Sequence, residues 1–181
     1  MAAAFTLFGM VACSTTTASA PDSSTQVSEP PTTFKCVKQG NGWATIGEKG
    51  NFTTKSPLIT WDSKEFGPEY TPDKRCNIVS AKLTKAVVDN GGKLGLLKIK
   101  VGSLNNQKVV CVIKDAQTSC NDGNTLFTLN QKHSDKPAES LQKIFQQYSE
   151  GSASNSKLDQ NATSDSILLK NLVDLEAGKK L

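Results

Sequence analysis

Apolar positions repeat with the periods of strands and helices between residues 34 and 149, while the chain on either side is polar and rich in small residues. The first repeat is Phe34–Lys38, where apolar and polar residues alternate as in a half-buried strand. Asn41-Gly42 then predicts a turn into Trp43–Ile46 as the hairpin partner. Further strands are predicted at Pro57–Trp61, Leu97–Val101, Val109–Ile113 and Leu126–Leu129, with a loop at Gly102–Gln107 and a turn at Asp122-Gly123.

Within Pro57–Trp61, alternation places Leu58 and Thr60 on one face and Ile59 and Trp61 on the other, so only one of these pairs is expected to be fully buried.

The clearest helix follows Thr71, which can cap it. Pro72 suits the first helical position and Asp73 suits the positive end of the helix dipole. An apolar stripe runs along this helix at Cys76, Val79, Leu83 and Val87, and Asn90-Gly91-Gly92 ends it. The stripe is typical of a core-facing helix.

A second helix is predicted from Pro137, with apolar residues at Leu141, Ile144, Phe145 and Tyr148. The order of strands, helix, strands and helix predicts an α+β fold. We expect one small domain over residues 34–150, with an antiparallel sheet of about five to six strands, covered on one face by two helices. Residues 151–181 are predicted as a polar linker followed by an apolar helical tail at Ile167–Leu175, which either docks on the domain or binds a partner.

The chain begins with an apolar stretch, Ala2–Ala12, that ends in Cys13. This stretch is too short to span a bilayer, which needs roughly 20 apolar residues, but it fits the core of a signal peptide. We therefore expect residues 1–13 to be an export signal of the bacterial lipoprotein type, short at its front, with lipid on Cys13. Because Met1–Ala4 lacks the usual Lys or Arg, two alternatives stay open: cleavage near Ala18–Ala20 without lipid, and an N-terminal helix with a free thiol.

Residues 14–33 are rich in Ser, Thr and Pro and contain no aromatic residue. Such a segment cannot bury enough apolar surface to offset its ordering entropy, so we expect a flexible tether. The protein would then lie on the exported side of a membrane in the cell envelope, with a soluble periplasmic or secreted form as the alternative.

The four other cysteines, Cys36, Cys76, Cys111 and Cys120, form no Cys-x-x-Cys motif. In an exported protein this favours disulfides over zinc or thioredoxin-type chemistry. Four cysteines allow three pairings, of which we prefer Cys36–Cys76 and Cys111–Cys120. On the loop-entropy model these bridges would stabilise the fold by roughly 4 and 3 kcal/mol.

The formal net charge is +4, and the excess of basic residues lies between residues 34 and 100. A basic face toward anionic lipid could be formed by Lys82, Lys85, Lys93, Lys98 and Lys100, although an ordinary solvated surface is the simpler interpretation. No basic run is interleaved with aromatic residues, which disfavours nucleic acid as a partner. We expect a monomer with no metal and no cofactor.

The sequence offers little catalytic chemistry. His133 is the only histidine, and it lies in a polar loop without a G-x-S-x-G elbow before it. Asp62, Glu65 and Glu69 could serve acid–base work or bind a cation, but they flank a surface turn. We therefore expect no enzyme and no catalytic residue.

A binding patch is predicted at Trp61, Phe66, Tyr70 and Arg75, where large side chains stand beside paired charges. The alternative is that these aromatic residues simply pack in the core.

From Phe34 to about Gly151 the sequence resembles the circadian oscillating protein family of cyanobacteria. The resemblance is carried by Pro57–Trp61, Phe66–Pro72, Arg75-Cys76, Val79-Ser80, Leu97–Gly102, Asn105, Val109–Cys111, Cys120 and Leu126–Leu129. The turn that is usually Asn-Gly in the family is Asn105-Asn106 here. The resemblance implies peripheral association with membranes and an abundance that varies with the daily cycle, but it implies no reaction.

Together these features predict an exported, lipid-tethered, non-enzymatic envelope protein that binds an unidentified ligand or partner. Two alternatives are a small hydrolase-like or cation-binding site at Asp62, Glu65 and Glu69, and a purely structural or stress protein of the envelope.

Overall fold

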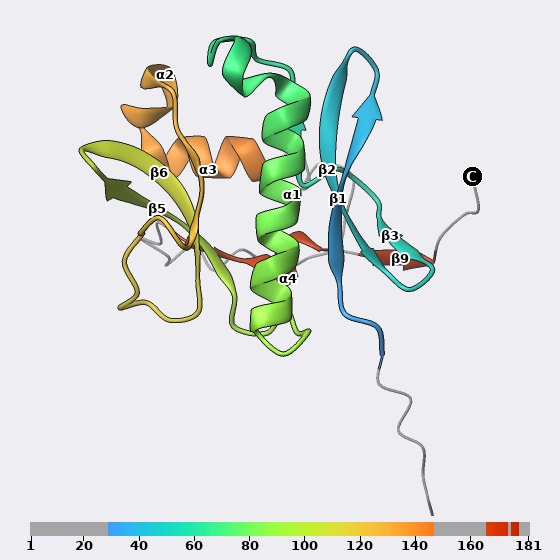
Figure 1. The fold of residues 1–181 in the computed structure, drawn as a ribbon. Coiled ribbons are helices and arrows are strands. Elements are labelled where there is room, and N and C mark those ends of the chain that lie inside the picture. Colours follow the sequence, from blue (N-terminus) through green and yellow to red (C-terminus); the bar gives the residue numbers. More distant parts are fainter. Residues whose placement is uncertain (1–28, 147–165, 174, 178–181) are drawn as a thin grey trace, which may run out of the picture.

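The computed structural model describes residues 29–146, 166–173 and 175–177. These residues form two antiparallel sheets with the long helix α1 (Pro72–Asp89) standing between them (Figure 1). The first sheet has the strand order β1-β2-β3-β9, with β4 also pairing with β2. Its strands are β1 (Thr33–Gln39), β2 (Gly42–Lys49), β3 (Phe52–Thr54), β4 (Ile59–Trp61) and β9 (Leu175–Ala177).

The second sheet has the order β7-β6-β5-β8. Its strands are β5 (Lys98–Leu104), β6 (Gln107–Ile113), β7 (Thr125–Thr128) and β8 (Ser166–Leu168). The shorter helical elements are η1 (Pro68–Tyr70), α2 (Gln131–Ser134), α3 (Pro137–Gln146) and α4 (Leu169–Leu172). The α+β class of the single small domain is confirmed, whereas the strands divide into two sheets instead of one.

The turns differ in detail from the sequence-based expectations. Gly102–Gln107 is not a loop, because β5 and β6 continue to a two-residue turn at Asn105-Asn106. Both asparagines have positive φ, 49° and 63°, which asparagine tolerates better than most residues and which a tight hairpin turn requires. The first hairpin turns one residue earlier than expected, at Gly40-Asn41, since Gly42 already pairs with Gln39.

Leu58 departs from the expected alternation. Ile59 and Trp61 are buried and Thr60 is exposed, as a half-buried strand requires, but Leu58 is buried as well. Leu58 lies before β4 begins at Ile59, so its side chain need not follow the in-and-out alternation of that strand. Its backbone N–H donates to the Thr45 carbonyl at 2.8 Å, which fixes the approach to β4.

Helix α1 begins at Pro72 and ends at Asp89, as predicted. Its buried stripe contains Cys76, Val79, Leu83 and Val87, with Ser80 beside them. Thr71 occupies the N-cap position, but its hydroxyl accepts no backbone hydrogen bond, so the expected side-chain cap is absent. Pro72 has no N–H that needs a partner, and the Asp73 carboxylate accepts from the backbone N–H groups of Asp73 and Lys74.

The predicted helical tail is wrong for most of its length. Only Leu169–Leu172 is helical, and on either side of it β8 pairs with β5 while β9 pairs with β3. The segment therefore runs from one sheet to the other (Figure 1). Leu169, Leu172 and Val173 are buried in the common core, so this segment is part of the domain.

Two disulfides are present, Cys36–Cys76 and Cys111–Cys120, which is the pairing preferred from the sequence. The first joins β1 to α1 and the second joins β6 to the loop before β7. Cys120 lies directly over β5, where a Cβ atom on Gly102 would overlap its sulfur. Gly102 is therefore the residue that lets the second bridge close against the sheet.

A buried polar contact joins the first sheet to α1. The Thr45 side chain, which is fully buried, accepts a hydrogen bond from Trp61 Nε1 at 3.0 Å. The Thr45 Oγ1 atom also lies 3.1 Å from the hydroxyl oxygen of Ser80 on α1. Strands β2 and β4 and helix α1 therefore meet at one hydroxyl group.

We predict that Thr45→Val lowers the free energy of unfolding by about 1–3 kcal/mol, because it leaves the buried Trp61 N–H without its acceptor. Urea unfolding followed by tryptophan fluorescence measures the loss. Thr53→Val is the matched control, since Thr53 lies on the exposed side of β3, and its effect should stay within about 0.5 kcal/mol. Equal effects of the two substitutions would contradict a structural role for the Thr45 hydroxyl.

Candidate functional site

The predicted binding patch lies where β4 leads into α1. The connection runs over residues 62–71 and includes the short helix η1, and the first turn of α1 follows it. Gly67, just before η1, has φ of 74°, a conformation that favours glycine, and it turns the chain toward Pro68. The fold therefore brings Trp61, from the end of a buried strand, close to Arg75, from the start of a helix.

Arg75 is the centre of this surface. Its guanidinium carbon lies 4.6 Å from the centroid of the Phe66 ring and 5.5 Å from that of Trp61. Arg75 Nε donates to the Tyr70 carbonyl oxygen at 3.0 Å, and Nη2 donates to the Ser63 carbonyl oxygen. The side chain thus contacts two aromatic rings and holds both ends of the connecting loop.

Trp61 belongs to the core. Only 4% of its surface is exposed, and its ring meets the Phe127 ring edge to face, with the centroids 5.5 Å apart. Phe127 lies on β7, so this contact joins the two sheets. Trp61 therefore packs in the core, as the alternative interpretation held, and its ring contacts the Arg75 guanidinium from the core side.

Tyr70 is the exposed member of the predicted patch. Its side chain is 55% exposed, and Lys74 Nζ lies 5.9 Å from the ring centroid. Phe66 is half-buried beside Arg75. The structure therefore brings all four predicted residues together, with Trp61 inside and Tyr70 outside. We call Phe66, Tyr70 and Arg75 the Arg75 surface.

The three carboxylates near this surface do not converge on one point. Glu65 accepts a hydrogen bond from the Asn130 amide, whereas the Glu69 carboxylate lies 3.8 Å from Lys74 Nζ. Asp62 acts on Arg75 through its charge. Among the described residues, no group of three or more His, Cys, Asp or Glu side chains is arranged to hold a metal ion.

The electrostatics of the loop follow from these neighbours. Burial lowers the pKa of Arg75, and the charges of Asp62 and Glu65 act in the opposite direction. The pKa of Asp73 is lowered, chiefly by a hydrogen bond with the Thr71 side chain and further by backbone N–H groups. Both groups therefore keep their charges at neutral pH, because the arginine pKa starts far above it and the aspartate pKa falls still further below it.

Other predicted residues lie elsewhere. Cys13 lies in residues 1–28, which fall outside the described residues, as do residues 147–165, which include Tyr148 of the predicted second helix and most of the predicted linker that begins at residue 151. Within the part of the chain that the structure describes, no helix is both long and apolar enough to cross a bilayer.

His133 lies on α2, where its backbone N–H donates to the Asn130 side chain at 3.0 Å. Among the basic residues, Lys82 and Lys85 line a cavity beside α1, whereas Lys98 and Lys100 project from the face of β5 opposite Ile99 and Val101.

Two residues contribute to this region although the sequence did not indicate them, Phe127 and Asn130. Phe127 had the pattern of an ordinary strand residue, and Asn130 that of a loop residue. Asn130 caps α2 through its side-chain oxygen and also donates to Glu65, which lies 65 residues away in sequence. No local signal identifies such a partner, since the contact depends on how the two sheets pack.

The arrangement is suited to recognition. Arg75 still has N–H donors beyond the two that hold the loop, and exposed aromatic surface lies next to it. The residues of the Arg75 surface include no nucleophile with a base in hydrogen-bonding reach.

Comparison with known families gives one result. The family model described as Circadian oscillating protein COP23 matches residues 33–176, well over half of the chain. The match extends through β8 and α4 into β9, the segment that joins the two sheets. No curated protein and no solved structure matches the chain.

We predict that Arg75→Lys lowers the free energy of unfolding by about 1–2 kcal/mol, because lysine cannot supply the planar fork that reaches two carbonyl groups between two rings. Thermal and urea unfolding measure the change. Lys74→Gln is the control from the same helix turn, since the Lys74 side chain is exposed and its pair with Glu69 is long. If Arg75→Lys is as stable as that control, the guanidinium does not hold the loop.

Proposed function

Since the chain belongs to the circadian oscillating protein COP23 family, we propose that it is an exported, membrane-tethered envelope protein that binds another protein and catalyses no reaction. The family description further suggests an abundance that follows the daily cycle. The observation that carries the binding proposal is the Arg75 surface, where a fixed guanidinium lies beside an exposed tyrosine.

The chemistry of this surface favours a protein partner. Tyrosine and arginine are enriched among the residues that dominate binding energy at protein interfaces. Tyr70 can contribute a large rigid side chain, and the Arg75 guanidinium is already ordered by its bonds to Ser63 and Tyr70. A preordered side chain loses little conformational entropy when it is buried by a partner. Charges of both signs lie nearby, on Glu69 and Lys74, which favours a mixed polar rim over an anion site.

The disulfides support export. Structural disulfides form and persist in oxidising compartments and are rare in the cytosol. Cys36–Cys76 and Cys111–Cys120 leave Cys13 as the cysteine without a partner in the domain. Cys13 follows an apolar stretch of signal-peptide length, so lipid attachment there accounts for it.

The positions of the reactive side chains support a non-enzymatic role. Glu65 accepts a hydrogen bond from Asn130, whereas Glu69 is exposed and lies 3.8 Å from Lys74 Nζ, so the two carboxylates have different partners and do not form the matched pair that acid–base work uses. His133 lies on the short helix α2, where its backbone N–H, and not its ring, donates to the Asn130 side chain.

The binding proposal predicts that Tyr70→Ala reduces recovery of a crosslinked partner from native membranes by at least about tenfold, the loss expected for a residue that dominates an interface. Because Tyr70 is exposed, the unfolding midpoint should stay close to that of the wild type. Crosslinking followed by affinity capture and quantitative mass spectrometry measures the recovery.

Phe52→Ala is the matched control, since Phe52 is an exposed aromatic residue on β3, away from the Arg75 surface. Equal recovery with Tyr70→Ala and Phe52→Ala would place the interface elsewhere. If the wild-type chain recovers no protein above background, the proposal fails and a purely structural envelope protein becomes the better interpretation.

Export and tethering predict a mature chain that begins at Cys13 and carries lipid. Intact-mass spectrometry of the protein isolated from membranes, before and after alkaline hydrolysis of ester-linked acyl chains, measures the modification. An unlipidated N-terminus at residue 21 or later would contradict the tether while leaving export in place.

A further inference from the structure

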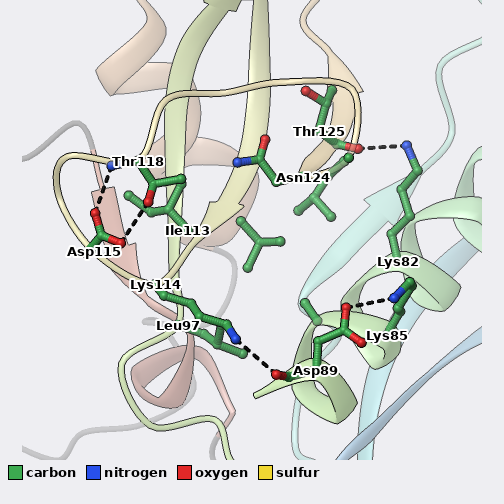
Figure 2. Close-up of a pocket in the computed structure, with 14 residues that line it drawn as sticks. Lys82, Lys85, Asp89, Leu97, Ile113, Lys114, Asp115, Thr118, Asn124 and Thr125 are labelled. Carbon is green, nitrogen blue, oxygen red and sulfur yellow. Dashed lines mark hydrogen bonds and ion pairs between the residues drawn. The ribbon is translucent and has the colours of Figure 1, made fainter.

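A second site lies on the other half of α1. A cavity of about 280 Å³ opens between this helix and the loop that joins β6 to β7 (Figure 2). Its inner side is apolar, formed by Leu97, Val112, Ile113 and Leu126, all of which are buried in the fold. Its volume is that of about nine water molecules, just below the range of about 300–1,000 Å³ for pockets that hold drug-sized ligands, which suits a smaller ligand.

The opening of this cavity carries three lysine ammonium groups. Lys82 reaches from α1 to the Thr125 carbonyl oxygen at 2.7 Å, and Lys114 reaches back to the Asp89 carbonyl oxygen at 2.9 Å. Lys85 lies 2.7 Å from the Asp89 carboxylate. Figure 2 shows these side chains around the opening. Each of these hydrogen bonds uses one of the three donors of its ammonium group, so donors remain for a ligand.

The carboxylates at the cavity are satisfied by the protein itself. Asp89 pairs with Lys85, and Asp115 accepts from the Thr118 backbone N–H at 2.9 Å and from its hydroxyl at 2.8 Å. These bonds lower the pKa of Asp115, which keeps it ionised and bound to its own loop. Lys85 compensates Asp89, but Asp115 keeps its charge, because the groups that bond to it are neutral. The lining therefore carries three ammonium groups and two carboxylates, a net charge of +1, and Lys82 and Lys114 are the cations without a carboxylate partner among the lining residues.

The outer wall of the cavity is held in place before any ligand arrives. The Cys111–Cys120 bridge ties the loop to β6, and the Asn124 carbonyl oxygen accepts from the Val112 N–H at 3.0 Å. Asn121 and Asn124 bond to each other, since the Asn124 side chain accepts from the Asn121 N–H at 2.8 Å. A preformed wall lowers the entropic cost of binding.

We propose that this cavity binds a small amphiphile with one anionic head group and a short apolar chain, of the organic carboxylate class. The head group would accept hydrogen bonds from Lys82 and Lys114, and the chain would cover the apolar inner side. Neutral analogues leave the ammonium groups unpaired, and anions without a chain leave the apolar surface exposed. Both should bind weakly. This site is distinct from the Arg75 surface, because the first cavity residue on α1, Lys82, follows Arg75 by seven residues, or about 10 Å along the helix, and the cavity continues from there to Asp89.

Isothermal titration calorimetry on the full chain tests this with three probes: octanoate, 1-octanol and acetate. We expect octanoate to bind with one-to-one stoichiometry, and the other two to bind at least about tenfold more weakly. This comparison uses the wild-type chain and so does not depend on any variant. Octanol binding as tightly as octanoate, or no saturable heat with octanoate, would overturn the proposal.

Variants locate the site. Lys82→Gln and Lys114→Gln should each weaken octanoate binding by about tenfold, the loss expected for one charge-assisted hydrogen bond. Ala86→Leu should abolish binding by filling the cavity without changing its charge. Lys74→Gln, from the same helix but outside the cavity, and Tyr70→Ala should leave binding unchanged. Unchanged binding in both Lys82→Gln and Lys114→Gln would show that octanoate binds elsewhere.

A membrane lipid could offer the same anionic chemistry. Cosedimentation with phosphatidylglycerol vesicles, with and without octanoate, separates the two sources. Competition by octanoate supports one cavity that accepts a free amphiphile. The proposal would be overturned if octanoate gave no calorimetric signal and did not reduce vesicle binding. The protein would then bind lipid head groups on its surface and not in the cavity.

Discussion

The hydroxyl group of Thr45 is the contact on which most of the described structure depends. It accepts the Trp61 N–H and lies beside the Ser80 hydroxyl, so it fixes β4 and α1 relative to β2 at a point that water does not reach. An unsatisfied indole N–H in this position would cost more than the hydrogen bond itself contributes. The bond therefore determines the orientation of the Trp61 ring. The same ring packs against Phe127 of the second sheet and lies under Arg75, so the surface of the molecule depends on this buried contact.

Two sheets that share one core need connections that no single hairpin supplies. Helix α1 packs against both, and the segment from Ser166 to Ala177 adds a strand to each. The Cys36–Cys76 bridge reinforces the first connection, and on the loop-entropy model it contributes about 4 kcal/mol by restricting the unfolded chain. In a domain of this size such a contribution is a large part of the net stability, which is typically about 5–15 kcal/mol. The disulfides are therefore integral to the fold.

Local patterns predict local structure well in this chain. The apolar stripe of α1, with Pro72 at its start, and the alternation of Leu97, Ile99 and Val101 each reflect one element facing one core. The 166–177 segment could not be predicted in the same way. Its apolar run is short, and it forms strands only because β3 and β5 each leave an edge for it. The same limit applies to the site. The sequence indicated Arg75 and its aromatic neighbours, but the Asn130 contact depends on how the two sheets pack, and the cavity depends on how α1 packs beside the loop between β6 and β7.

Helix α1 carries two different kinds of surface because its two ends differ electrostatically. Arg75 lies in the first turn, where the positive end of the helix dipole disfavours a cation, and it is held there by two carbonyl groups, two rings and nearby carboxylates. At the other end the dipole favours cations, and Lys114 reaches the terminal Asp89 carbonyl from outside the helix. The ammonium groups there need few protein partners, so they keep donors for a ligand. The binding proposed for the Arg75 surface would therefore use an arginine whose position the protein already fixes. The ligand proposed for the cavity would pair with lysine donors that the protein leaves available.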